Sequence, residues 1–164
     1  MMKVKTIDHI SICVPNVEAA SKLFCDIFGA KFEFFTESEA LECRMAFHTW
    51  GDKIVTMEEP TTATSTFAKF LEKHGPGIHH MALEVEDLEE TIKSLASNGV
   101  KVVNTQLTGR VRREALVLPK DAFGILLQLI EWREECKGSL EEQLNLSRVG
   151  GLQIPVGDSF KKKR

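Results

Sequence analysis

The sequence predicts an α+β domain made of two βαβββ modules that enclose one cleft. Three observations support this prediction: apolar segments that alternate as strands do, two capped amphipathic helices, and a weak internal repeat with an offset of 71 residues. A strand, a helix and three further strands follow one another twice along the chain. Two such units are expected to bury their apolar faces against each other.

The first module is expected over about residues 4–60. Residues 4–14 alternate and are rich in β-branched side chains, which predicts a strand that Pro15 ends. A helix follows, with Asn16 as its N-cap and Gly29 at its C-terminal end. Three strands are expected near residues 31–36, 40–48 and 53–58, and a helix over 64–74 links this module to the next.

The second module is expected over about residues 77–132 and repeats this order. A strand over 78–85 precedes a helix that Asp87 caps, and strands follow near 100–104, 111–118 and 124–131. We therefore expect residues 1–132 to form a single domain. Residues 133–164 are rich in Gly, Ser and charge and are expected to form a polar tail, whose basic run at 161–164 we interpret as solvated.

Composition excludes several classes of protein. The apolar share of 43% is that of a globular chain, and the net charge of −3 is spread over interspersed residues, which argues against nucleic acid as a partner. Apolar runs fall far short of the roughly 20 residues that cross a bilayer, so we expect a cytoplasmic protein without membrane contact. The four cysteines lack a Cys-x-x-Cys pair and are interpreted as reduced packing residues: Cys13, Cys25, Cys43 and Cys136.

Two histidines are candidates for a metal site. His9 and His80 occupy the same place in the first strand of each module, so the pseudo-twofold relation should bring both imidazoles to one cleft. Neutral imidazole is a good ligand for divalent transition metals. The alternative is that each histidine is a strand residue hydrogen-bonded to a neighbour, but the repeat-related pair favours the metal site.

Three segments resemble methylmalonyl-CoA epimerases, members of the vicinal oxygen chelate superfamily. They are His-Gly-Pro-Gly-Ile-His-His-Met-Ala-Leu-Glu-Val-Glu-Asp at 74–87, Ile-Asp-His at 7–9 and Leu-Pro-Lys-Asp-Ala-Phe-Gly-Ile-Leu-Leu-Gln-Leu at 118–129. The resemblance covers roughly residues 5–131 and implies the glyoxalase-like fold of this superfamily.

The resemblance implies a divalent metal (Zn, Co, Ni, Mn or Fe) that chelates the substrate's thioester and carboxylate oxygens. Its four ligands fall on His9, Thr56, His80 and Gln128, while His79 should point to the opposite sheet face. Epimerases carry Gln or Glu, and then Glu, where this chain has Thr56 and Gln128. Glu58, two residues beyond Thr56 on the same face, could supply a carboxylate, whereas Glu131 should face away from Gln128.

The resemblance also assigns a catalytic base to Glu42, within Leu-Glu-Cys-Arg-Met-Ala. Epimerisation needs a base on each side of the α carbon, and the second base would fall on Gln128, whose amide cannot accept a proton. The expected function is that of a metal-dependent isomerase or lyase, with enolate chemistry on an acyl-CoA or other α-carbonyl acid.

Two other functions fit the same fold. One is a small-molecule binding protein without catalysis, which the neutral side chains of Thr56 and Gln128 favour. The other is a glyoxalase-type or dioxygenase-type enzyme, for which a dioxygenase needs two histidines and one carboxylate. Under each interpretation the partner is a small molecule, and a homodimer is the expected assembly.

Overall fold

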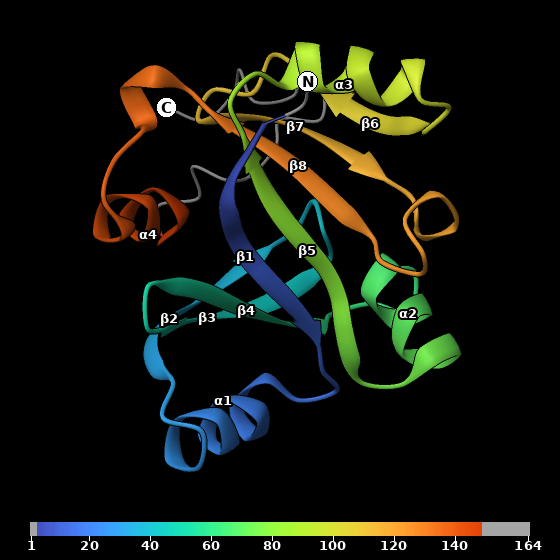
Figure 1. The fold of residues 1–164 in the computed structure, drawn as a ribbon. Helices are drawn as coiled ribbons and strands as arrows, with labels where there is room; N and C mark the ends of the chain where they lie inside the picture. The colour runs from blue at the N-terminus through green and yellow to red at the C-terminus, as the bar shows by residue number, and fades with distance from the viewer. Residues whose placement is uncertain (1–2, 149–164) are drawn as a thin grey trace, which may run out of the picture.

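Eight strands form one mixed sheet in the computed structural model, which describes residues 3–148 (Figure 1). The strand order is β2-β3-β4-β1-β5-β8-β7-β6, so each module contributes one half of the sheet. The basic run at 161–164 lies outside the described residues. No helix within residues 3–148 is long and apolar enough to cross a membrane.

The elements follow the expected βαβββ order in each half of the chain. The first module contains β1 (Val4–Cys13), α1 (Val17–Asp26), β2 (Lys31–Ser38), β3 (Cys43–Trp50) and β4 (Lys53–Pro60). Helix α2 (Thr66–His74) links it to β5 (Gly77–Val85), α3 (Leu88–Ser97), β6 (Val102–Gln106), β7 (Arg112–Val117) and β8 (Leu127–Trp132). Three short helices complete the list: η1 (Pro119–Asp121), η2 (Glu134–Cys136) and α4 (Leu140–Arg148).

Strands β1 and β5 pair antiparallel at the centre of the sheet and join the two modules. Each of them also pairs in parallel with the last strand of its own module, β1 with β4 and β5 with β8. The sheet is therefore continuous within one chain, and both modules contribute to the same face of it. We call this face, which carries His9, Ser11, Thr56, His80 and Gln128, the inner face.

Two bulges interrupt the β1–β5 pairing beside the histidines. Ile7 pairs with Leu83 and His9 with Ala82, which leaves Asp8 as an extra residue in β1. Ser11 pairs with His80 and Ile12 with Ile78, which leaves His79 as an extra residue in β5. A bulge breaks strict alternation and can re-aim a side chain.

The outer face of the sheet is covered by α1 and α3. Helix α1 packs Val17 against Val14, Ala46 and Met57, and α3 packs Leu88 against an equivalent cluster in the second module: Val85, Ala115, Val117 and Leu129. Both helices begin with a side-chain cap, because Asn16 accepts from the Ala19 amide at 2.7 Å and Asp87 from the Glu90 amide at 2.9 Å.

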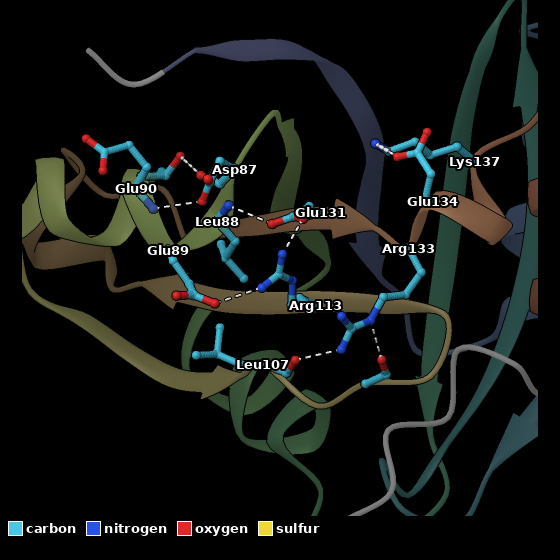
Figure 2. A network of polar contacts seen from close by, with 12 residues as sticks. Asp87, Leu88, Glu89, Glu90, Leu107, Arg113, Glu131, Arg133, Glu134 and Lys137 are labelled. Carbon is cyan, nitrogen blue, oxygen red and sulfur yellow. Dashed lines mark hydrogen bonds and ion pairs between the residues drawn. The ribbon is translucent and has the colours of Figure 1, made fainter.

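A carboxylate from the last strand of each module also holds the start of each helix. Glu59 of β4 accepts from the Val17 amide at 2.8 Å, and Glu131 of β8 accepts from the Leu88 amide at 2.7 Å. Arg113 lies between Glu131 and Glu89, as Figure 2 shows. Glu131 thus lies on the outer face with α3, on the opposite side of β8 from Gln128.

Helix α4 packs on the inner face, where the sequence predicted a polar tail. Leu144 contacts Phe34, Phe47 and Ile54 of the first module, while Leu146 joins Ala82, Ile130 and Trp132 of the second. Most of the helix is polar, so its composition resembles a solvated tail. A few leucines at helical spacing are enough to fix it because they reach both halves of the sheet.

Replacing Leu144 with alanine should destabilise the protein by about 2–5 kcal/mol, because Leu144 is buried in the cluster that anchors α4. Urea unfolding followed by circular dichroism would measure this change. Asn145→Ala, on the exposed side of the same helix, should change stability by less than about 0.5 kcal/mol. Equal stability of the two variants would contradict this role for α4.

Candidate metal centre

The structure brings His9 and His80 together on adjacent strands. Their Nε2 atoms are 3.2 Å apart and their rings are nearly perpendicular, at 82°. Two nitrogens bound to one ion at about 2.1 Å lie about 3.0 Å apart at a right angle and about 3.4 Å apart at the tetrahedral angle. The observed separation lies between these values, so it matches the spacing of two imidazoles on one ion, and it equally matches a hydrogen bond between the rings.

Asp8 orients His9 from behind. Its Oδ1 lies 2.7 Å from Nδ1 of His9, and its Oδ2 accepts a hydrogen bond of 2.7 Å from Nε1 of Trp132. Burial alone would raise the pKa of Asp8, but the bond to His9, the positive charges nearby and the bond to Trp132 lower it to about 2. An ionised Asp8 can only accept, so Nδ1 of His9 carries a proton and the bond fixes the ring with Nε2 facing His80.

His79 lies beside His80 rather than on the opposite face, contrary to the expectation from strand alternation. The bulge places Nδ1 of His79 2.9 Å from Nδ1 of His80, and the ring of His79 packs against Phe67 and Phe70 of α2. Burial lowers the pKa of His79 to about 4, and burial followed by nearby positive groups lowers that of His80 well below its usual value. Both rings are therefore neutral at pH 7, as metal ligation requires.

Thr56 and Gln128 lie on the same face as the histidines. Thr56 pairs with Ser11 across β1 and β4, and Gln128 pairs with Ala82 across β5 and β8. The hydroxyl of Thr56 and the carbonyl oxygen Oε1 of Gln128 are buried without a well-formed hydrogen bond to the described residues, but Thr56 lies close enough to Glu58, and Gln128 close enough to His80, to influence the pKa of each. Buried oxygens of this kind usually have a partner, so these two suit a ligand or an ion.

The four positions provide two imidazole nitrogens, one amide oxygen and one hydroxyl. Residues 3–148 contain no cluster of three or more His, Cys, Asp or Glu side chains arranged to hold a metal ion. The donors fit a transition metal through the histidines, while the two oxygen positions are neutral.

Glu58 is a further carboxyl group on the inner face. Its Oε2 accepts a hydrogen bond of 2.6 Å from the hydroxyl of Ser11, which lies on β1 between His9 and Cys13. Complete burial raises the pKa of Glu58 to about 7, although the bond to Ser11 acts in the opposite direction. Glu58 is therefore poised to exchange a proton near neutral pH.

Glu42 lies in the turn that leads into β3 and is not in contact with the histidine pair. Its backbone has a φ of 50°, and each of its carboxylate oxygens lies 3.0 Å from the hydroxyl of Thr64. Thr64 belongs to the loop between β4 and α2. The predicted base thus lies where this loop meets the turn, half-buried and held by one hydroxyl.

Sequence reasoning missed four residues around the site: Asp8, Arg112, Glu114 and Trp132. Glu114 of β7 accepts a hydrogen bond from Nε2 of Gln128, and it pairs at 3.4 Å with Arg112, whose guanidinium lies over the Trp132 ring. Only Asp8 had a sequence signal, as the residue directly before a candidate ligand. The others become neighbours of the site through strand pairing.

Because of Asp8, the free energy of unfolding should depend on pH in the acid range. Its folded-state pKa is depressed from 3.8 to about 2, so its contribution is complete above about pH 4 and is lost as pH falls toward 2. Urea unfolding should show a loss of about 2 kcal/mol from this group over that range. The variant Asp8→Asn should lack this part of the dependence, whereas Asp52→Asn, at an exposed turn, should keep it. An unchanged acid profile in Asp8→Asn would refute the assignment.

The chain is 28% identical over 127 residues to the uncharacterised protein YqjC of Bacillus subtilis, covering 76% of this chain and 91% of that protein. It is 30% identical over 127 residues to the ethylmalonyl-CoA/methylmalonyl-CoA epimerase of Cereibacter sphaeroides, covering 75% of this chain and 95% of that one.

A solved structure of a Streptomyces coelicolor methylmalonyl-CoA epimerase variant in complex with 2-nitronate-propionyl-CoA is also similar. It superposes with a TM-score of 0.70 at 25% identity, covering 79% of this chain and 99% of that one. Residues 8–115 match the family model described as "Glyoxalase/Bleomycin resistance protein/Dioxygenase superfamily". The chain therefore belongs to the glyoxalase/bleomycin resistance protein/dioxygenase superfamily.

Proposed function

We propose that the protein is a metal-dependent isomerase or lyase of the epimerase type that acts on an acyl-CoA or another α-carbonyl acid. The observation that carries this proposal is the pair of Nε2 atoms 3.2 Å apart, one of them oriented by the ionised Asp8. The similarity to epimerases supports the same chemistry. An ion bound here would stabilise the enolate oxygen that forms when the α proton is removed.

His9 and His80 would hold the ion through Nε2, and Gln128 and Thr56 would complete the set through their buried side-chain oxygens. The three rings form a chain of contacts, with Nε2 of His9 3.2 Å from Nε2 of His80 and Nδ1 of His80 2.9 Å from Nδ1 of His79. Ligation through Nε2 requires His80 to carry its proton on Nδ1. Because His79 can accept at its own Nδ1, His80 can change tautomer without leaving a buried ring nitrogen unpaired.

Glu42 remains the proposed base for the α proton. Gln128 cannot return a proton on the other side, because an amide is not basic at neutral pH. Glu58 is a second buried carboxyl group of the first module on the inner face, besides Asp8, and Ser11 fixes its position. A reaction with a single base, such as enolate formation followed by elimination or by protonation from water, agrees with this arrangement as well as epimerisation does.

A binding protein without catalysis is the second candidate function. The observation that favours it is that Thr56 and Gln128 are both neutral. Epimerases carry Gln or Glu at the first of these positions and Glu at the second. Under this proposal His9→Ala would leave the affinity for a small ligand intact. Under the enzyme proposal the same variant would lose metal and activity together.

Purified protein should contain close to one divalent ion per chain, and the double variant His9→Ala/His80→Ala should lose it, because imidazoles are the strongest donors of the set. Elemental analysis after reconstitution with Co, Zn or Ni, without an affinity tag that binds nickel, would measure this. His74→Ala removes an exposed histidine of α2 and should leave the metal content unchanged. A wild-type protein that binds none of these ions would exclude the metal-dependent function.

The metal-loaded protein should exchange the α proton of (2R)- or (2S)-methylmalonyl-CoA in deuterated water. Glu42→Gln should slow this exchange by about 10²–10⁴-fold without changing the metal content, because it removes a base and no ligand. Mass spectrometry of the recovered thioester would follow deuterium incorporation. Exchange at the uncatalysed rate by the wild-type protein would exclude this substrate, and wild-type exchange in Glu42→Gln would exclude Glu42 as the base.

A further inference from the structure

The side-chain amide of Gln128 is held in one orientation. Its Nε2 donates to Oε2 of Glu114 on the neighbouring strand β7, while its Oε1 is buried without a well-formed hydrogen bond and lies near His80. The reverse orientation would direct Oε1 at the carboxylate of Glu114, where two acceptors would repel each other. An amide beside a buried carboxylate therefore presents its oxygen on the other side, toward the cleft.

Glu114 is itself fixed on two sides. It is only 4% exposed, and its Oε2 pairs with the guanidinium of Arg112 at 3.4 Å. Arg112 packs over the ring of Trp132, whose Nε1 donates to Asp8, and Asp8 binds His9. The contacts that hold Gln128 and those that hold His9 thus meet at Arg112 and Trp132.

Glu114 also places a negative charge next to a neutral ligand set. A dication bound to two imidazoles, an amide and a hydroxyl would have no anionic ligand of its own. Glu114 lies beyond Gln128, on the far side of its amide, where a carboxylate both polarises the Gln128 oxygen and offsets part of the ion's charge. Residues that hydrogen-bond to metal ligands change metal affinity by about 10–100-fold.

We propose that Glu114 is a positioning residue that turns the oxygen of Gln128 toward the metal and supplies the anionic charge missing from the β8 ligand position. This inference rests on the proposed function, since it assigns a role toward the same ion. Gln128 on β8 would then be the metal ligand, and Glu114 on β7 would supply the negative charge beside it.

Moving the charge between the two positions tests this proposal. Glu114→Gln should weaken Co²⁺ binding about 10–100-fold, measured by competition with a chromophoric chelator. The double variant Glu114→Gln/Gln128→Glu, which transfers the carboxylate to β8, should bind Co²⁺ at least as tightly as the wild type. Glu89→Gln makes the same charge change on the exposed start of α3 and should have no effect on affinity. Thermal unfolding would confirm that all variants are folded.

Wild-type affinity in Glu114→Gln, or no recovery in the double variant, would overturn the proposal. A second measurement does not depend on metal. NMR spectra of the apo protein would show the side-chain amide protons of Gln128, which are assigned by their loss in Gln128→Leu. These protons should be shifted downfield and protected from exchange with solvent. Glu114→Gln should remove both effects. Amide signals like those of exposed glutamines in the wild type would overturn the orientation. If the wild type binds no metal at all, the proposed function fails, and this amide signal alone decides whether Glu114 orients Gln128.

Discussion

The antiparallel pairing of β1 with β5 is the constraint on which the site depends. This pairing joins the two modules into one sheet and sets His9 against Ala82 and His80 against Ser11. A slip of one residue would turn one histidine to the outer face, because side chains alternate along a strand. The register is held by the apolar clusters under α1 and α3, so the packing of the outer face determines the geometry of the inner one.

The inner face buries more carboxyl groups than a sheet core usually contains. Asp8, Glu58 and Glu114 are each less than 9% exposed, and each carboxyl group has a hydrogen-bond donor from another strand. Burying an unpaired charge costs several kcal/mol, which explains why the donors come as a set. Arg112 provides the nearby positive charge for two of these carboxylates and lowers the pKa of Asp8.

The sequence predicted the order of elements, the repeat and the closeness of His9 and His80, because strand periodicity and a fixed offset are local signals. It did not predict the places of His79 and Asp8, because alternation holds only until a bulge inserts a residue. Glu114 and Arg112 could not be found from spacing, since they reach the site through the β7–β8 pairing. Helix α4 was missed because two leucines in a polar segment are a weak signal until the surfaces they cover are known.

The two modules hold their helices in the same way but differ where they face the cleft. Glu59 and Glu131 make equivalent bonds to the first amides of α1 and α3, and Asn16 and Asp87 make equivalent caps. The inner-face residues at the corresponding positions of the same strands, Thr56 and Gln128, differ from each other. Alternate residues of one strand lie on opposite faces of the sheet. The outer-face contacts that hold the helices can therefore be the same in both modules, while the inner-face side chains differ between them. A twofold frame can thus present different chemistry to the two ends of an asymmetric substrate.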